Sequence, residues 1–289
     1  MSYIIKMPED AGTRYEVIKY PAGELQVRIY SDYLRPMCAA SSVTIVANIR
    51  DGQVMELALL ADAVHNIVKG LAPINLVLPY LPYARADRRF TSGDCNGLRT
   101  FGAVIDGMGF TNVFTLDAHS SMARRAIANL VDIYPGKLIA KAIKDIGAKD
   151  LVVLLPDKGA EARYTDLGVK VAYCEKHREA KSGKLSGFTV PDIDEGKVLI
   201  VDDICDGGGT FLGIAEELRR QRGFHGDLYL YVTHGIFSKG LGELSETFLR
   251  IYTSDSFRKS DTCDSPNVEI YPSWPLFKTA LEEKELARV

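Results

Sequence analysis

Short apolar runs recur along the chain, and each is followed at once by polar or glycine-rich residues. These runs occupy 43–49, 74–78, 113–116, 151–155, 198–201 and 228–232. Runs of this length between turn signals are typical of strands buried on both faces of a parallel sheet. Apolar residues at helical spacing lie between several of them, most clearly over 53–68, and again over 137–146 and 211–222. The alternation predicts an α/β fold with mainly parallel sheets flanked by helices.

Two stretches depart from this pattern. Residues 15–30 alternate between apolar and polar positions and are interrupted by Pro21 to Glu24, which predicts two short strands joined by a turn. Residues 175–184 are basic and contain few apolar side chains, and they follow a short strand predicted over 169–173. We predict a mobile loop here, which is either a lid over a ligand or a disordered surface hairpin.

The chain contains an internal repeat. Residues 43–52 match residues 198–207 in the spacing of apolar residues, acid and glycine, but only the second copy has the paired acids and the third glycine. The repeat predicts two domains related by duplication, separated near Tyr134-Pro135-Gly136. We place the first domain over 1–134, completed by the C-terminal helix 276–289, and the second over 135–275.

The second copy of the repeat has the composition of a phosphate site. Three glycines, Gly207 to Gly209, precede Thr210 and a predicted helix. Glycines allow φ > 0 and let backbone N–H groups point at an anion, and the helix dipole adds to the attraction. Asp202 and Asp203 stand at the end of the strand, where carboxylates contact sugar hydroxyls or a phosphate-bound Mg²⁺. The alternative is a tight turn with an N-cap, but adjacent acids without a ligand are costly there.

Other strand ends carry polar side chains as well. Arginines are dense over 85–99, after the strand 74–78; Asp117 and His119 follow the strand 113–116, and Asp157 follows the strand 151–155. Ligands of parallel sheets bind at the carboxyl ends of strands, and guanidinium groups there can hold a polyphosphate. The alternatives are a solvated loop for the arginines and a structural role for the histidine.

Composition excludes several classes of function. A net charge of −3 and a hydrophobic content of 46% indicate a globular protein without a polyanion-binding surface. Five scattered cysteines without CxxC spacing argue against a disulfide framework or a zinc site and favour a reducing compartment. No apolar stretch reaches the length of a membrane span, and the N-terminus lacks the pattern of a signal peptide. We expect a cytoplasmic protein that binds neither nucleic acid nor membrane.

The loop 202–210, with its DDxxDxGGT form, resembles the phosphoribosyl-pyrophosphate loop of type I phosphoribosyltransferases, and most closely that of the phosphoribosyl-pyrophosphate synthetases (ribose-phosphate pyrophosphokinases). Five further motifs follow that family's order, from about residue 15 to residue 253. They are YPAGE at 20–24, PYLPYARADRR at 79–89, DAH at 117–119, PDKG at 156–159 and KHR at 176–178.

This resemblance implies two phosphoribosyltransferase-like domains, an ATP-dependent transfer of diphosphate to ribose 5-phosphate, and a dimer-based homo-oligomer, possibly a hexamer. It also implies roles for residues at the matching positions. The acceptor sugar phosphate would be held by Asp202, Asp203, Asp206, Gly207, Gly208, Gly209 and Thr210. ATP would contact Tyr20, Ala22, Glu24, Arg85, Ala86 and Asp87. Mg²⁺ would meet His119 and Asp157, and the catalytic cations would be Lys176 and Arg178. A neighbouring subunit would supply the 20–24 turn.

Three positions depart from the family's pattern. Ala22 replaces an acid, Ala86 a glutamine, and Gly207 a threonine beside the acceptor's 5-phosphate. Gly207 leaves more room, so a larger 5-phosphorylated ribose such as ADP-ribose is the first alternative acceptor. A catalytically silent regulatory partner of an active synthetase is the second alternative, and a phosphoribosyltransferase that consumes the diphosphate is the third.

Overall fold

In the computed structural model, the chain folds into two compact units. Unit 1 comprises residues 1–134 and 274–289, and unit 2 comprises residues 135–273. The structure describes residues 2–7, 14–50, 53–147, 149–157, 163–164, 167–178, 185–193, 196–222, 224–257 and 265–288.

Unit 1 is built on a five-stranded parallel sheet with the order β1-β4-β5-β6-β7. Its strands are β1 (Ser2–Met7), β4 (Ser42–Ala47), β5 (Ile74–Leu78), β6 (Asn112–Leu116) and β7 (Leu130–Ile133). A separate antiparallel hairpin joins β2 (Tyr15–Lys19) to β3 (Leu25–Ile29). The helices are α1 (Ser31–Cys38), α2 (Val54–Val68), α3 (Gly97–Gly107), α4 (Ala123–Ala126) and α8 (Trp274–Leu286).

Unit 2 repeats this plan with one more strand. Its parallel sheet has the order β15-β14-β13-β12-β8-β9. The strands are β8 (Leu151–Leu155), β9 (Lys170–Tyr173), β12 (Lys197–Cys205), β13 (Asp227–Gly235), β14 (Arg250–Ser254) and β15 (Val268–Tyr271). The separate hairpin joins β10 (Glu175–Arg178) to β11 (Leu185–Thr189), and the helices are α5 (Gly136–Ile146), α6 (Gly209–Arg222) and α7 (Gly242–Thr247).

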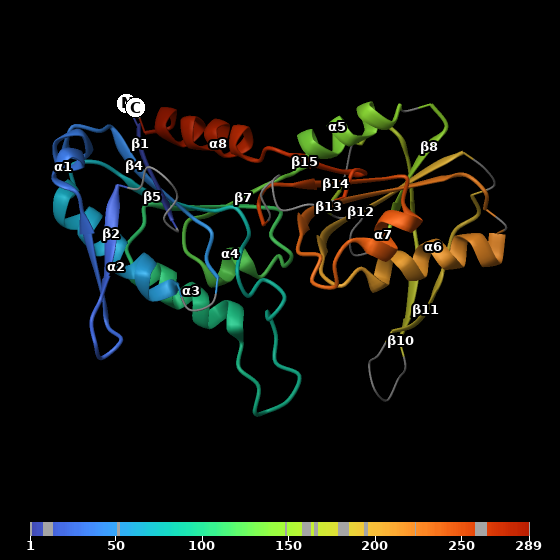
Figure 1. Cartoon of the computed structure of the whole chain (residues 1–289), viewed down its shortest axis with the longest axis horizontal. Helices are drawn as coiled ribbons and strands as arrows, with labels where there is room; N and C mark the ends of the chain where they lie inside the picture. Colours follow the sequence, from blue (N-terminus) through green and yellow to red (C-terminus); the bar gives the residue numbers. More distant parts are fainter. Residues whose placement is uncertain are drawn as a thin grey trace. The chain divides into compact units, whose positions relative to one another are not determined.

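Apolar side chains on both faces of each sheet explain why these strands form and pair. Every residue of β4, β5 and β8 is buried, as expected for parallel strands that helices cover on both sides. In unit 1, α2 and α3 cover one face and α8 the other; in unit 2, α6 and α7 lie opposite α5 (Figure 1). The predicted α/β class with two parallel-sheet units is confirmed.

The last helix of the chain belongs to the unit that contains the N-terminus. Glu285 of α8 accepts hydrogen bonds from the hydroxyls of Ser2 (2.9 Å) and Ser42, so the helix lies at the amino ends of β1 and β4 (Figure 1). Across the described residues, none of the helices combines the length and apolarity that a membrane crossing needs.

One local prediction needs correction: within the mobile loop predicted over 175–184, residues 175–178 form a strand that pairs antiparallel with 185–189. Residues 179–184 lie outside the described residues, and the mobility of the segment and its role as a lid stay predictions. The buried side chain of Phe188 explains the difference, because it holds the partner strand against α6 near Gly213. The apolar anchor of this hairpin is therefore on β11 and not within the basic segment.

Candidate active site

The glycine-rich loop of unit 2 connects the carboxyl end of β12 to the first turn of α6. Gly208 has a φ of +80°, and a Cβ there would lie 3.1 Å from both Cδ atoms of Leu244. Both observations require glycine at this position. The carbonyl of Gly208 accepts hydrogen bonds from the amides of Phe211 (3.0 Å) and Leu212 (3.1 Å), which starts the helix. The loop is thus a tight turn that leads directly into a helix of four turns.

The turn leaves backbone donors available to a ligand. The Gly208 amide donates to the Cys205 thiol, but among the described residues the amides of Gly207, Gly209 and Thr210 bond to no acceptor. Such amides at a helix N-terminus carry partial positive charge and attract anions. The geometry therefore offers the anion cradle that the glycines predict.

The carboxylates before the turn have different environments. The strand runs on to Cys205, so Asp202 and Asp203 lie inside β12 and point to opposite faces of the sheet. Asp202 is half-buried and its Oδ1 accepts from the Asp203 amide (3.0 Å). Asp203 is buried, and its Oδ2 lies 3.2 Å from Nη2 of Arg163. One acid is therefore accessible in part, while the other is held in an ion pair.

The acidic residues of the loop affect the pKa of the neighbouring Cys205 thiol. Burial raises the pKa of Cys205 to about 12, and the charges of Asp206 and Asp202 add to the rise. A thiol with this pKa stays protonated at neutral pH, so Cys205 is no nucleophile. Asp206 is exposed, and its Oδ1 accepts a hydrogen bond of 2.5 Å from the hydroxyl of Ser238.

Other predicted residues of unit 2 share this edge of the sheet. Because β8, β9 and β12 are parallel, their carboxyl ends meet at one edge. Asp157 follows β8 there and is half-buried. The β10–β11 hairpin begins just beyond the end of β9, so Lys176 and Arg178 lie on a strand that starts at the same edge. The side chains of Lys176 and Arg178 lie outside the described residues.

In unit 1, the structure brings two predicted segments together. Arg85, Ala86 and Asp87 follow β5, and His119 follows β6, the neighbouring parallel strand. The hydroxyl of Ser120 donates to Oδ2 of Asp87 at 2.6 Å and links the two loops. Burial by itself would raise the pKa of Asp87, but hydrogen bonds from Ser120 and Arg88 outweigh it and hold the pKa below its ordinary value. Asp87 therefore stays ionised at neutral pH.

Backbone strain marks the second of these loops. Asp117 has a φ of +47° and is buried, a conformation that is uncommon outside glycine. Its amide donates to the carbonyl of Ile133 (2.9 Å), and the Ala118 amide donates to Oδ1 of Asp132 (2.9 Å). These bonds fix the turn that presents the exposed His119. Strained turns of this kind are concentrated at functional sites.

The predicted turn at 20–24 lies at the end of the β2–β3 hairpin. The Tyr20 amide donates to the Glu24 carbonyl (2.9 Å), and Gly23 has a φ of +96°. All five residues of the turn are exposed, and the hairpin end extends away from the sheet of unit 1 (Figure 1). Tyr20, Ala22 and Glu24 are therefore not brought to the loops that follow β5 and β6 by their own hairpin.

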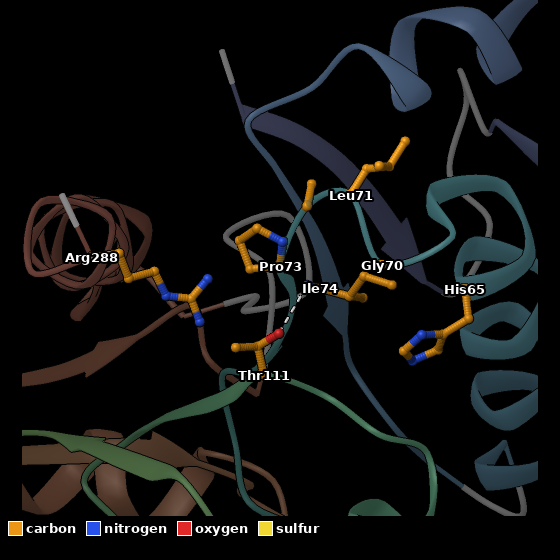
Figure 2. Close-up of a pocket in the computed structure, with 8 residues that line it drawn as sticks. His65, Gly70, Leu71, Pro73, Ile74, Thr111 and Arg288 are labelled. Atoms are coloured by element: carbon orange, nitrogen blue, oxygen red, sulfur yellow. Dashed lines mark hydrogen bonds between the residues drawn. The ribbon is translucent and has the colours of Figure 1, made fainter.

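A cavity of unit 1 lies elsewhere. Its volume is about 380 Å³, and its lining includes His65, Pro73, Thr111 and Arg288 (Figure 2). The Ile74 amide donates to the hydroxyl of Thr111 across its wall (3.2 Å). Ile74 begins β5, so the cavity opens at the amino end of the sheet, opposite the carboxyl ends that carry 85–87 and 119. We do not assign it to the predicted site.

Sequence reasoning missed four residues that shape these loops. Arg163 pairs with Asp203, Ser120 with Asp87, and Ser238 with Asp206, while the side chain of Lys239 lies over Gly207. Nothing in the sequence singles out Arg163 or Ser120, since each of their contacts joins segments from different strands. Ser238 and Lys239 come soon after the predicted strand 228–232, and that position beside the glycine-rich loop was the one available signal.

Comparison with known proteins gives concordant results. No protein-family model matches the chain. A ribose-phosphate pyrophosphokinase of Thermococcus kodakarensis is 30% identical over 234 residues, which cover 78% of this chain and 79% of that protein. One from Cereibacter sphaeroides is 30% identical over 247 residues, covering 81% and 72%. The crystal structure of phosphoribosylpyrophosphate synthetase from Mycobacterium smegmatis superposes over 97% of both chains, with a TM-score of 0.78 and 19% identity, which shows the fold.

Proposed function

Because the chain belongs to the ribose-phosphate pyrophosphokinase family, we propose that it transfers the β,γ-diphosphoryl group of ATP to the anomeric hydroxyl of ribose 5-phosphate. The products are 5-phosphoribosyl 1-pyrophosphate and AMP. The observation that carries this proposal is the turn of unit 2, where the free amides of Gly207, Gly209 and Thr210 lie beside Asp202 and Asp206.

The acceptor fits this turn by its chemistry. The amides at the N-terminus of α6 bind the dianionic 5-phosphate, because the donors are fixed and the helix dipole adds to the attraction. The half-buried Asp202 accepts hydrogen bonds from the ribose hydroxyls. We also assign Asp203 to the acceptor site; its ion pair with Arg163 supports an ionised carboxylate that only accepts hydrogen bonds.

ATP is assigned to the loops of unit 1. Arg85 is exposed at the end of β5 and suits the bidentate binding of a phosphate. Asp87 stays ionised and accepts hydrogen bonds, and Ala86 lies between the two. We assign Tyr20, Ala22 and Glu24 to the nucleotide of a neighbouring subunit, which the exposed hairpin end supports.

The donor set fits a magnesium ion that arrives with phosphate. No group of three or more His, Cys, Asp or Glu side chains that could hold a metal occurs among the described residues, so the protein alone provides no complete cage there. Mg²⁺ is usually held by one or two carboxylates together with substrate phosphates and waters, and Asp157 is a suitable carboxylate. Imidazole suits Mg²⁺ less well, so His119 serves as a ligand or contacts a nucleotide phosphate. When bound, Mg²⁺ neutralises charge on the phosphates.

The reaction is an in-line displacement at phosphorus. The anomeric oxygen forms a bond to the β-phosphorus, the bond from that phosphorus to the α,β-bridging oxygen breaks, and AMP leaves with the bridging oxygen while the hydroxyl proton goes to solvent. Catalysis of such transfers rests on positioning and charge neutralisation. Lys176 and Arg178, on the hairpin that starts at the carboxyl edge of unit 2, supply positive charge to the transferring group.

A product assay tests this proposal. The protein is incubated with Mg-ATP and ribose 5-phosphate, and AMP and the sugar diphosphate are identified by mass spectrometry. We expect equimolar formation of both products. Absence of AMP with every 5-phosphorylated ribose tested would refute the diphosphokinase assignment. If the same protein then altered the turnover of an active synthetase, it would be a regulatory partner.

Gly207 favours ADP-ribose as a second candidate acceptor. A glycine beside the phosphate-binding amides lacks the side chain of the family's threonine, and the stem of Lys239 that covers it would have to move before a group attached to the 5-phosphate fits. ADP-ribose presents a free anomeric hydroxyl and a 5-phosphate that is esterified to a second phosphate. The ratio of kcat/KM for ADP-ribose and for ribose 5-phosphate decides between the acceptors, and no turnover of ADP-ribose would remove the second one.

We assign the enzyme to the cytoplasm and to a dimer-based homo-oligomer. The four cysteines that the structure describes are free thiols, which suits a reducing compartment.

If the 20–24 turn acts on a neighbouring subunit, inactive Glu24→Ala and Lys176→Ala chains should restore activity when they are assembled together. Light scattering gives the oligomer's mass, and a monomeric active enzyme would refute the shared site.

A further inference from the structure

Lys239 lies on a short loop that is fastened to the phosphate-binding turn. This loop follows β13, the strand beside β12, and its Ile236 and Phe237 amides both donate to the Cys205 carbonyl (2.9 and 3.1 Å). The Ser238 amide donates to the Asp206 carbonyl (3.0 Å), and the Ser238 hydroxyl donates to the same residue's carboxylate. Four hydrogen bonds therefore place Lys239 beside the turn without using its own side chain.

The aliphatic part of Lys239 covers Gly207. A Cβ added to Gly207 would lie 3.3 Å from both Cδ and Cε of Lys239, and 3.5 Å from its Cγ. Three consecutive carbons thus lie flat against one glycine. The space that the missing side chain of Gly207 leaves is therefore filled by Lys239, and is not open as the sequence suggested.

The charge of Lys239 has no carboxylate partner in the part of the chain that the structure describes. The residue is exposed, and among the described residues no carboxylate pairs with its ammonium group. The ammonium nitrogen is bonded to Cε, one of the carbons that lie against Gly207, so it lies close to the start of the glycine-rich turn. A lysine commonly lays its aliphatic stem along the protein surface and keeps its ammonium group in water. Here the stem lies on the backbone that forms the anion cradle.

We propose that Lys239 is a phosphate-binding residue of the acceptor site and takes the place of the side chain that is absent at Gly207. Its ammonium group binds an oxygen of the phosphate that the amides of the turn hold, as a point charge with three donors. This inference rests on the proposed function of the turn and adds a cation to it. In this interpretation, Gly207 leaves the space in which the stem of Lys239, from the neighbouring loop, lies.

Lys239→Met is the decisive variant, because methionine keeps an unbranched apolar stem over Gly207 and removes the charge. Binding of ribose 5-phosphate is measured by calorimetry without ATP, and KM and kcat are measured separately with Mg-ATP. We expect Kd and KM for the acceptor to rise about tenfold, because one charge-assisted hydrogen bond is lost, while kcat changes less. The dependence of Kd on salt should weaken in the variant, since an ionic contact is gone.

Lys149→Met is the matched control. Lys149 is an exposed lysine of the same unit, in the turn before β8, at the amino edge of the sheet and so opposite the turn. It should leave Kd and KM unchanged. Equal affinity of wild type and Lys239→Met for ribose 5-phosphate would overturn the inference even if turnover proves the proposed function. Binding that weakens in Lys239→Met would support it even if no AMP is formed, and a wild type that binds no sugar phosphate would overturn both.

A double-mutant cycle tests the contact with Gly207. Gly207→Ala places a Cβ against the lysine stem, so it should weaken acceptor binding in the wild type. In the Lys239→Ala background, the same change should have little effect, because the stem that it displaces is gone. Additive effects on Kd would show that the two residues act independently. They would contradict the proposal that the stem of Lys239 takes the place of the side chain that is absent at Gly207.

Discussion

The two units contain the same strand-loop-helix arrangement, yet the loops that follow β4 and β12 differ in their residues and in their hydrogen bonds. In unit 1, β4 ends at Ala47, after which the Arg50 amide donates to Oε1 of Gln53 (3.0 Å) and the Gln53 amide to the Arg50 carbonyl (3.0 Å); residues 51 and 52 lie outside the described residues. In unit 2, β12 continues to Cys205, and glycines occupy the corresponding turn. The same framework therefore carries a glycine-rich turn in unit 2 and, in unit 1, a loop in which a glutamine side chain accepts from a backbone amide.

The residues before the two loops show the same division. Ala47 and Asn48 occupy the positions that Asp202 and Asp203 occupy in the second copy of the repeat. The first unit thus lacks paired carboxylates at these positions, and its polar residues follow β5 and β6 instead, where Ser120 and Asp87 join the loops. Duplication gives each unit the same strand ends, and the side chains at those ends decide which ligand each can bind.

The largest expected effect is on kcat, and it distinguishes substitutions in the hairpin of unit 2 from those in the hairpin of unit 1. We expect Lys176→Ala, in the β10–β11 hairpin of unit 2, to lower kcat by about 10²–10³, as loss of a group that stabilises the transition state does elsewhere. The melting temperature should not change. Glu24→Ala, in the β2–β3 hairpin of unit 1, should mainly raise KM for ATP. Steady-state kinetics and thermal unfolding measure these effects, and normal turnover of Lys176→Ala would remove its catalytic assignment.

The glycine-rich turn should be the next most sensitive place. Gly208→Val combines a φ of +80° with a contact to Leu244, so it should lower the free energy of unfolding by about 1–3 kcal/mol and abolish acceptor binding. Gly168→Val is the control, since Gly168 has a φ of +69° but no atom within 4 Å of an added Cβ. It should share the loss of stability and keep acceptor binding. Equal binding in both variants would contradict the role of the turn.

The two acids of β12 should separate stability from binding. Asp203→Asn removes the charge that faces Arg163 and should lower the free energy of unfolding by about 1–3 kcal/mol, because a partly buried guanidinium loses its partner. Asp202→Asn should change stability by less, since its carboxylate is half-buried, whereas that of Asp203 is buried and pairs with Arg163. Both should raise KM for the acceptor. Urea unfolding and kinetics measure the two effects, and identical stabilities would argue against the ion pair.

The smallest expected effect concerns the link between the loops of unit 1, and it depends on pH. Ser120→Ala should lower the free energy of unfolding by about 1 kcal/mol at pH 7. The pKa of Asp87 is lowered in the folded state, so the stability it contributes is complete above the ordinary pKa of an aspartate and disappears as pH falls through the folded-state pKa. The difference between variant and wild type should therefore shrink in acid. A constant difference at pH 7 and pH 3 would show that the bond does not favour the ionised form.

Much of the fold could be predicted because the central strands are mostly apolar. β8 has no polar residue, and the one polar residue of β5, Asn75, is buried and its side chain accepts a hydrogen bond from Asn112 (2.8 Å). The basic strand β10 could not be predicted in this way, because its order depends on Phe188, which lies in another segment and packs against α6. Local composition shows whether a residue can be buried, but not which distant side chain holds it.

The candidate site likewise has one part that the sequence predicts and another that depends on contacts between distant segments. The acids and glycines of 202–210 are contiguous, so the sequence alone indicates an anion-binding turn. The contacts that complete it join loops from different strands: Arg163 reaches Asp203, and Lys239 reaches Gly207. The sequence alone shows that Gly207 departs from the family's pattern. That Lys239 covers this glycine could not be predicted, because the contact depends on where the loop after β13 lies.

The position of α8 has a consequence for how the chain matures during translation. Unit 2 is one continuous segment, whereas unit 1 needs a helix that leaves the ribosome after all of unit 2. Domains tend to fold as units while synthesis proceeds. Unit 2 can therefore acquire its native packing first, and unit 1 is complete only when Glu285 of α8 accepts the hydrogen bonds from the hydroxyls of Ser2 and Ser42.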